Sequence, residues 1–288
     1  MALIELKDVS KLYGFGDATN VALDEVTLTI EKGECVAVMG PSGCGKSTLM
    51  NVIGLLDHPS HGDYYLNGRR SARLGSSQRA KLRRDKIGFI FQSFNLLGRL
   101  TAIDNVALPL LYKGKSPLAR HKIARATLER VGLHDRTYYY PHQLSGGQTQ
   151  CVAIARALVN DPEIIIADEP TGNLDTESSR LVMELLAEIH KSGNTVLFVT
   201  HNPELTRYAT RVMYMQDGMI KHDEQKPLGV VGRYAHTVIY GEPESHEDDD
   251  IAGVSALMKA RERNEPAEKP ARKTTKRRKT TKKRGGTK

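Results

Sequence analysis

The sequence predicts an α/β fold organised around a parallel sheet whose strands are buried on both faces. Four strand-length segments are continuously apolar instead of alternating: ECVAVMG, KIGFIFQ, EIIIADE and NTVLFVT. Such runs are typical of parallel strands covered on both sides, and the helical patterns between them supply the connections that parallel strands need. With 288 residues, 39% of them hydrophobic, the chain can bury a core of this kind.

Composition divides the chain into three parts, and no part is an internal repeat. We expect residues 1–225 to form the ordered domain, residues 226–250 a C-terminal extension that ends in the acidic run GEPESHEDDD, and residues 251–288 a basic, disordered tail. Within the tail, IAGVSALMKARERN has apolar residues at helical spacing. This short helix either docks onto another surface or stays solvated and frayed.

The formal charge of +8 comes from the tail. Residues 269–288 hold 11 of the 42 Lys and Arg residues and no acid, which leaves 31 basic against all 34 acidic residues in 1–268, a net charge of −3. A polyanion is therefore expected to bind the tail and not the folded part.

The sequence also indicates where the protein works. No run reaches the roughly 18 apolar residues that a membrane helix needs, and MALIELKDVS alternates like a strand, unlike a signal peptide. We therefore expect a cytoplasmic protein. Cys35, Cys44 and Cys151 are odd in number and lack metal-type spacing, so we expect reduced thiols.

A phosphate-binding loop follows the first buried strand. GPSGCGKS at 40–47 matches G-x-x-x-x-G-K-[ST] and precedes the helical segment STLMNVIGLL. The glycines let backbone N–H groups face phosphate oxygens, Lys46 reaches the β- and γ-phosphates, and Ser47 offers its hydroxyl to magnesium. The pattern predicts a nucleoside triphosphate site.

The apolar strand in EIIIADEPT ends in two carboxylates, Asp168 and Glu169. Because successive strand side chains diverge, one can hold the metal while the other faces the attacking water. The alternative is a solvated strand end, which the four preceding apolar residues and Pro170 disfavour.

A second anion-binding helix start occurs in LSGGQTQCVAIARAL at 144–158. It serves either a second ligand or the same ligand held by another molecule. Since each motif occurs once, a two-fold dimer is economical: each protomer's Ser-Gly-Gly helix would cap the γ-phosphate in the other's loop.

Taken together, LSGGQ, GPSGCGKST, IIIADEPTGNLD and VTHN resemble the ATP-binding subunit of an ABC transporter over residues 1–225. The resemblance implies a P-loop NTPase fold of the ABC type. That fold has a RecA-like core, an antiparallel β subdomain and a helical signature subdomain at about 93–158. It further implies hydrolysis of ATP with Mg²⁺, and an ATP sandwich formed in a homodimer or with an equivalent partner.

The resemblance also implies roles for individual residues. Glu169 would be the general base or orient the water, His201 would contact the γ-phosphate, and Lys46 and Gln92 would complete the catalytic set. Magnesium would be held by Ser47, Gln92 and Asp168.

The implied nucleotide contacts come from three regions. Tyr13 would stack on adenine, with Phe15 as a rival, and Asp175 would lie in the loop that crosses the dimer interface. The other contacts are Gly40, Pro41, Ser42, Gly43, Cys44, Gly45, Lys46, Ser47, Thr48, Ser145, Gly146, Gly147 and Gln148.

Three stretches indicate which branch of the ABC transporter family the chain resembles: NVIGLLDHPSHGDYYLNG, LTAIDNVALPLLYKG and ADEPTGNLD. They are similar to the lipoprotein-release, macrolide-export and cell-division ATPases. This implies a separate permease with four transmembrane helices and a large extracytoplasmic domain, and a location on the inner face of the cell membrane. Export, lipoprotein release and control of wall hydrolysis all stay open.

The chain departs from this branch at two places. Thr149-Gln150-Cys151 stands where Gln-Gln-Arg is usual, which replaces a guanidinium with a thiol, and Asn202 stands where an acid is common.

The basic tail also leaves an alternative function open. A non-transport ABC ATPase would use it on nucleic acid or ribosomes, whereas a transport subunit would lay it on anionic lipid or keep it as a solubilising end.

Overall fold

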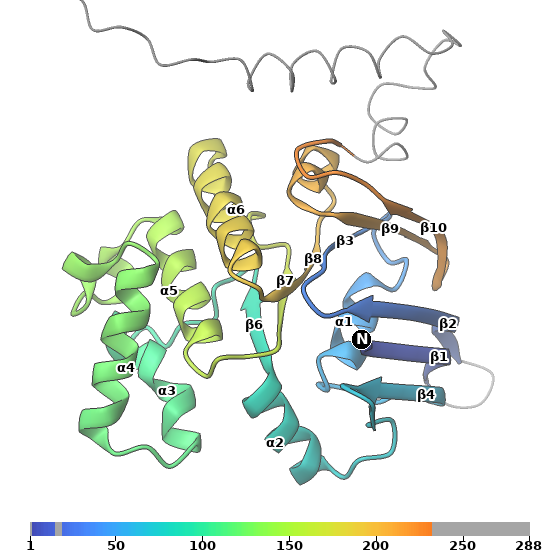
Figure 1. Cartoon of the computed structure of the whole chain (residues 1–288), viewed down its shortest axis with the longest axis horizontal. Coiled ribbons are helices and arrows are strands. Elements are labelled where there is room, and N and C mark those ends of the chain that lie inside the picture. The colour runs from blue at the N-terminus through green and yellow to red at the C-terminus, as the bar shows by residue number, and fades with distance from the viewer. Residues whose placement is uncertain (1, 15–18, 232–288) are drawn as a thin grey trace, which may run out of the picture. The chain divides into compact units, whose positions relative to one another are not determined.

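Two sheets frame the protein, whose computed structural model describes residues 2–14 and 19–231 (Figure 1). The larger sheet has the strand order β10-β9-β3-β8-β7-β6, in which only the edge strand β10 is antiparallel to its neighbour. Its strands are β3 (Cys35–Met39), β6 (Ile87–Phe91), β7 (Ile164–Asp168), β8 (Thr195–Val199), β9 (Arg211–Gln216) and β10 (Met219–Gln225). The four predicted apolar strands are β3, β6, β7 and β8, so the parallel sheet is confirmed.

Both faces of this sheet are buried because successive side chains of a strand point to opposite sides. In β7, Ile164 and Ile166 join one hydrophobic cluster, whereas Ile165 and Ala167 join the other. This is why the strand shows no polar alternation in the sequence.

The smaller sheet covers one face. It is antiparallel, with the order β2-β1-β4-β5. Its strands are β1 (Ala2–Tyr13), β2 (Asn20–Glu31), β4 (His61–Leu66) and β5 (Arg69–Arg70). The helix α1 (Lys46–Ile53) packs in the same cluster, and the buried Tyr64 hydroxyl donates to the Ile53 carbonyl at 2.6 Å.

Helices cover the other face. These are α3 (Ala102–Tyr112), α4 (Pro117–Arg130), α5 (Gly146–Leu158) and α6 (Thr176–Lys191). In α6, Val182, Met183, Leu186 and Ile189 form the buried stripe at helical spacing. Figure 1 shows α3, α4 and α5 grouped on the side of the large sheet away from β1, β2 and β4.

The remaining elements are short or exposed. The 3₁₀ helices are η2 (His134–Arg136), η3 (Pro141–Gln143) and η4 (Pro203–Tyr208). The helix α2 (Ser76–Lys86) buries none of its residues. Within residues 2–14 and 19–231, no helix is both long enough and apolar enough to span a membrane.

The C-terminal end of the described chain folds back on β9. Lys226 is buried, and its Nζ donates to the carbonyls of Ala209 at 2.6 Å and Val230 at 2.7 Å. The acidic run, the short helix and the basic tail expected beyond residue 231 lie outside the described residues, and the domain boundaries stay a prediction. Cys35, Cys44 and Cys151 are all free thiols, as predicted.

Candidate active site

The loop between β3 and α1 is shaped by three glycines with positive φ. Gly40 has φ +148° and Gly45 φ +102°; a Cβ on them would lie 2.1 Å from the Met215 carbonyl oxygen and 2.4 Å from that of Ala22. Gly43 also has a positive φ, +82°, but a Cβ there would meet nothing within 4 Å. The loop is therefore closely packed at both ends and open in the middle. Its helix starts without a side-chain cap, which leaves the positive helix end available to an anion.

Lys46 lies across this loop. Its side chain is nearly buried, and Nζ donates to the carbonyls of Gly40 and Pro41, both at 2.8 Å. The ammonium also acts electrostatically on Asp168, the last residue of β7, and partly opposes the rise in its pKa that burial causes. The loop and the strand end thus face each other.

Two carboxylates occupy this strand end in different environments. The Asp168 carboxyl is partly buried, and burial together with the neighbouring Glu169 charge raises its pKa despite the opposing effect of Lys46. Glu169 has φ +44°, a left-handed conformation that is uncommon outside glycine. Its N–H donates to the Val199 carbonyl at 3.2 Å, which ties the turn to the end of β8. Because of this turn, Glu169 does not continue the strand alternation.

His201 pairs with Glu169. Its Nδ1 lies 3.1 Å from Glu169 Oε1, and its side chain is 69% exposed against 24% for Glu169. The Glu169 carboxylate accepts a hydrogen bond from Nδ1–H, which leaves Nε2 outside this pair. The structure thus brings two of the predicted catalytic residues together from neighbouring parallel strands.

Gln92 follows β6 and contacts the loop after β7. Its Nε2 donates to Asn173 Oδ1 at 3.4 Å, and Asn173 Nδ2 donates to the Gln92 carbonyl at 3.1 Å. A Cβ on Gly172 would lie 2.6 Å from Gln92 Nε2, so a larger residue there would displace the Gln92 side chain. Asn173 is a contact that the sequence reasoning did not identify.

Two polar side chains of α5 hold the same loops, and sequence reasoning missed their role. Gln150 is wholly buried; its Nε2 donates to the carbonyls of Pro170 at 2.7 Å and Phe91 at 3.4 Å. Arg156 donates to the carbonyl of Phe94 at 2.9 Å and to that of Asn95. The available signal was a pair of long polar side chains within a helix that is otherwise largely apolar.

The Ser-Gly-Gly segment starts α5 with a capping box. Ser145 Oγ accepts from the Gln148 N–H at 3.2 Å, and Gln148 Oε1 accepts from the Ser145 N–H at 3.1 Å. The N–H groups of Gly146 and Gly147 belong to the first turn and have no partner within the helix. Among the described residues, no hydrogen bond or ion pair joins 145–148 to 40–48 of the same chain. The start of α5 and the phosphate loop, the two predicted anion-binding sites, are thus separate within one protomer.

Asp175 starts the neighbouring helix α6. Its two carboxylate oxygens accept from the N–H of Ser178 at 2.9 Å and from its hydroxyl at 2.7 Å, and these bonds lower the Asp175 pKa. A Cβ on Gly147 would lie 2.9 Å from Ser178 Oγ, so the starts of α5 and α6 lie close together. The predicted interface residue is an N-cap in this structure.

Tyr13, at the end of β1, is 42% exposed and lies beside α1. Its hydroxyl donates to Asp57 Oδ2 at 3.0 Å, and Lys11 Nζ lies 4.9 Å from the ring centroid. The lysine thus covers one face of the Tyr13 ring. Phe15, the rival residue, lies outside the described residues.

Cys151 is partly buried against the helical cluster. Burial raises the pKa of its thiol to about 11, so it is a neutral group at physiological pH. The thiol occupies this position as a small apolar side chain.

The oxygen donors near the loop suit a magnesium ion. Ser47 offers a hydroxyl, Gln92 an amide oxygen and Asp168 a carboxylate, all hard ligands. Burial, and after it the neighbouring Glu169 charge, raise the pKa of Asp168, and a bound cation would favour its ionised form. The described part of the chain has no cluster of three or more His, Cys, Asp or Glu side chains, so the other ligands would be phosphate and water.

Comparison with known proteins shows the family. Residues 23–172 match the family described as ABC transporter. An uncharacterised ABC transporter ATP-binding protein of Methanocaldococcus jannaschii is 52% identical over 218 residues, which cover 76% of this chain and 97% of that protein. The macrolide export ATP-binding/permease protein MacB of Pectobacterium atrosepticum is 49% identical over 224 residues, or 78% of this chain and 34% of that protein. The chain therefore spans about a third of this MacB relative.

Solved structures agree with the sequence comparison. The dimeric ATP-binding cassette MJ0796, in a post-hydrolysis state with ADP and Pi, matches with a TM-score of 0.72 and 44% identity, covering 78% of this chain and 99% of that chain. These relatives favour transport over the predicted alternative function on nucleic acid or ribosomes. The predicted fold class and ATPase activity are confirmed, and the chain belongs to the ABC transporter family as an ATP-binding, ATP-hydrolysing member.

Proposed function

We propose that this chain is the motor subunit of an ABC transporter, which binds Mg²⁺-ATP between two copies and drives a separate permease. The observation that carries the proposal is the Glu169–His201 pair, 3.1 Å apart, at the strand ends where Asp168 faces Lys46. Phosphoryl transfer requires positioning and charge stabilisation more than covalent chemistry, and these groups supply both.

Each residue has a defined part in hydrolysis. The loop N–H groups and Lys46 hold the phosphates, while Ser47, Gln92 and Asp168 would hold Mg²⁺, which offsets phosphate charge when bound. Glu169 orients the attacking water: His201 fixes Oε1, so Oε2 accepts the hydrogen bond from that water. A contact from His201 to the γ-phosphate would use Nε2, the ring nitrogen that is not paired with Glu169.

The second copy completes the site. The N–H groups of Gly146 and Gly147 lie at a helix end with no partner in the helix, and that end is separate from the phosphate loop of its own chain. A two-fold dimer places each such end against the other copy's γ-phosphate. The dimeric structure of the similar cassette MJ0796 supports this arrangement.

A groove of about 970 Å³ provides the surface for the permease. It lies between α2, β6, α3 and α5, and its walls combine apolar Leu56, Phe89 and Tyr112 with basic Arg84. Tyr112 is 67% exposed and Leu56 43%, and both line this one groove, where a partner would cover them. The groove reaches Phe91, the residue before Gln92, so its occupant would lie near the hydrolysis site. The MacB relatives carry a permease within their own chain by name, which supports this partner and a place on the inner membrane face.

Replacing Glu169 with Gln tests the proposal. The variant keeps the side-chain size and loses the charge that orients water, so ATP hydrolysis should fall by about 100-fold or more. ATP should still bind, and a dimer should accumulate on gel filtration with ATP. Glu188, exposed on α6, provides the matched control, and Glu188→Gln should behave like the parent. Hydrolysis by Glu169→Gln at the parent rate would show that Glu169 does not orient the water.

A further inference from the structure

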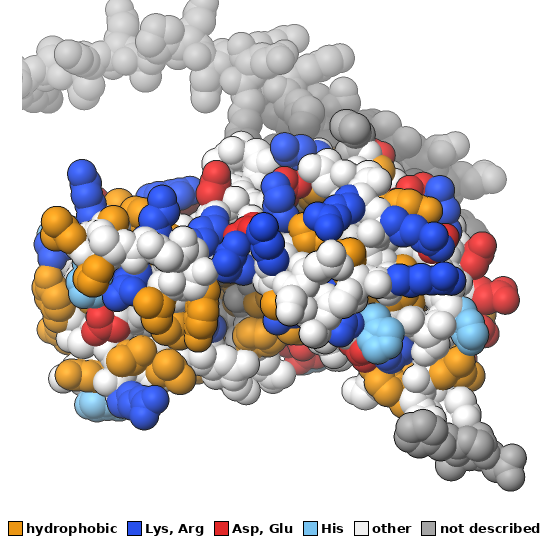
Figure 2. All heavy atoms as spheres, turned by 90° about the horizontal axis from the view of Figure 1, so that it is seen from below, with side chains coloured by type: hydrophobic (Ala, Val, Ile, Leu, Met, Phe, Trp, Pro, Cys, Tyr) orange, Lys and Arg blue, Asp and Glu red, His pale blue; other side chains and the backbone are white. Residues whose placement is uncertain are grey.

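A dense basic segment lies in the folded part, despite its net negative charge. Residues 67–86, NGRRSARLGSSQRAKLRRDK, contain eight Lys or Arg and one acid, Asp85. They form β5, a short loop and α2. Figure 2, seen from the side on which α2 lies in Figure 1, shows Lys and Arg side chains gathered across the middle of this face.

Part of this charge is neutralised within the protein. Ion pairs join Arg70 to Asp63 at 2.5 Å, Arg84 to Asp85 at 2.7 Å, and Lys86 to Glu163 at 2.5 Å. Over residues 2–14 and 19–231, by contrast, no carboxylate lies within 4 Å of Arg69, Arg73 or Arg79. These three guanidinium groups are therefore available to an external anion.

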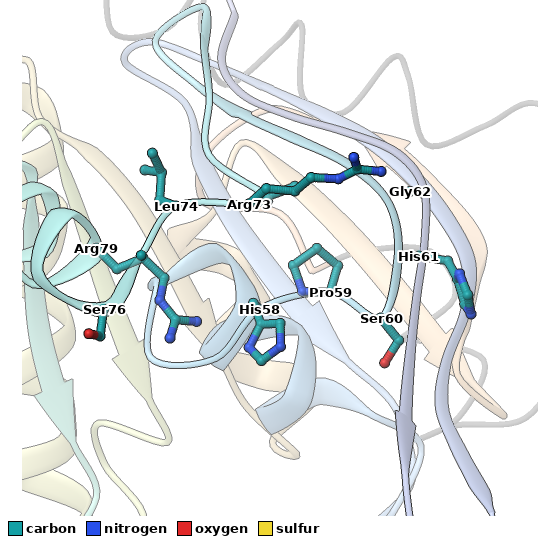
Figure 3. Close-up of a pocket in the computed structure, with 11 residues that line it drawn as sticks. His58, Pro59, Ser60, His61, Gly62, Arg73, Leu74, Ser76 and Arg79 are labelled. Atoms are coloured by element: carbon teal, nitrogen blue, oxygen red, sulfur yellow. The ribbon is translucent and has the colours of Figure 1, made fainter.

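Two of these arginines border a pocket of about 400 Å³. Arg73 and Arg79 come from the loop before α2 and from α2 itself, and His58 and His61 line it from the segment after α1 (Figure 3). In Figure 3, the side chains of Arg79 and His58 turn toward the same part of the pocket, and Arg73 runs along another edge. No acidic residue lines the pocket.

The helix α2 separates this pocket from the permease groove. Ser76 and Arg79 line the pocket, whereas Ser77, Ala80 and Arg84 line the groove. A permease segment seated in the groove would therefore hold the pocket close to the membrane surface, and in this respect the argument rests on the proposed function.

We propose that the α2 face, defined by Arg73, Arg79 and the pocket that these two border, together with Arg69 just before it in the chain, binds the head groups of anionic phospholipids. Guanidinium groups match phosphate oxygens in geometry and charge. The basic residues extend well beyond one pocket, which suits a charged surface better than a single free phosphate. Lipid binding would orient the subunit with its groove toward the permease.

Vesicle sedimentation of the full chain tests the proposal. Binding to phosphatidylglycerol vesicles should exceed binding to phosphatidylcholine vesicles and should fall with added salt. Each basic residue near an anionic surface contributes about fivefold in affinity, so Arg73→Gln/Arg79→Gln should bind about 25-fold more weakly. A Lys32→Gln/Lys191→Gln control, which neutralises two exposed lysines elsewhere, should bind like the parent.

A second set of variants excludes any contribution of the basic tail to vesicle binding. In these, the eleven Lys and Arg residues of 269–288 are replaced with Gln, and the arginine pair and control pair are compared again. ATPase activity in vesicle-free solution should stay at the parent level in the arginine variant, because neither arginine belongs to the nucleotide site. If the parent chain itself shows no ATPase activity, the proposed function is rejected, and the vesicle result still stands on its own.

Three results would overturn the lipid proposal. These are equal binding to neutral and anionic vesicles, an unchanged affinity of Arg73→Gln/Arg79→Gln in the tail-neutralised chain, and an equal loss in the control pair. A loss confined to membranes that contain the permease would assign the face to a protein partner. Inhibition of vesicle binding by inorganic phosphate at low millimolar concentration would assign the pocket to a free anion.

Discussion

Gln150 is a buried residue whose replacement should affect ATP hydrolysis more than it affects folding stability. Its amide nitrogen donates to the carbonyls of Pro170 and Phe91, which lie next to Glu169 and Gln92. Its Oε1 has no hydrogen-bond partner in the described structure. Gln150→Met keeps the length and removes both polar atoms, so it tests these bonds with little change in volume.

Two opposing effects set the expected stability. Loss of the 2.7 Å bond leaves the Pro170 carbonyl buried and unpaired, which costs about 1–3 kcal/mol. Removal of the unpaired Oε1 offsets part of this cost, since a buried unpaired polar atom is itself unfavourable. We expect a net loss of about 1 kcal/mol in the free energy of unfolding, or about 2–4 °C in Tm for a domain of this size.

The catalytic effect should be larger than the stability effect. Without Gln150, the loops that carry Gln92 and Glu169 are no longer fixed to α5, so kcat should fall on the order of tenfold. The KM for ATP should stay close to the parent value because the phosphate loop is not touched. Thermal unfolding and steady-state ATPase assays measure both quantities. Gln216→Met, the same change at an exposed position, is the control. Parent-like kcat in a Gln150→Met protein that is destabilised as expected would refute the positioning role.

Two further predictions concern the glycine loop and a buried thiol. Gly40→Ala should destabilise the protein by more than about 2 kcal/mol, since its Cβ would lie 2.1 Å from the Met215 carbonyl oxygen. Gly43→Ala faces open space and should cost only about 1–2 kcal/mol of backbone strain. Urea unfolding distinguishes the two variants, and equal losses of stability would contradict the geometry. Burial raises the pKa of the Cys35 thiol to about 12 in the folded protein from 9.0, so its contribution to stability is full below pH 9 and is lost as pH rises toward 12. Cys35→Ala should flatten this alkaline loss in pH-dependent unfolding, and an unchanged slope would contradict the assignment.

The sequence predicts the strands and the phosphate loop well because both depend on local patterns. Continuous apolar runs mark β3, β6, β7 and β8, and the glycine spacing before Lys46 marks the loop. The left-handed turn at Glu169 has no such mark, since it is held by a bond to β8 that only the folded sheet creates.

Two other features were hidden for physical reasons. Gln150 and Arg156 look like surface residues by type, and only tertiary packing turns them toward backbone carbonyls of distant loops. The basic segment 67–86 was masked by the summed charge of −3 over residues 1–268. Net charge describes the whole domain, whereas binding depends on where charges without partners gather.

The position of α5 explains how the two ends of the proposed dimer site communicate. Its first turn presents N–H groups at Gly146 and Gly147, which would meet the other copy's phosphate, while Gln150 and Arg156 hold the loops beside Gln92 and Glu169 of its own copy. A helix is stiff over this distance, so movement of its first turn is transmitted to those loops. Because Phe91 and Arg156 also line the groove proposed for the permease, a permease segment seated there would act on the same contacts. Coupling through shared contacts is reciprocal: if nucleotide closure shifts the groove, occupation of the groove must shift nucleotide affinity by the same factor.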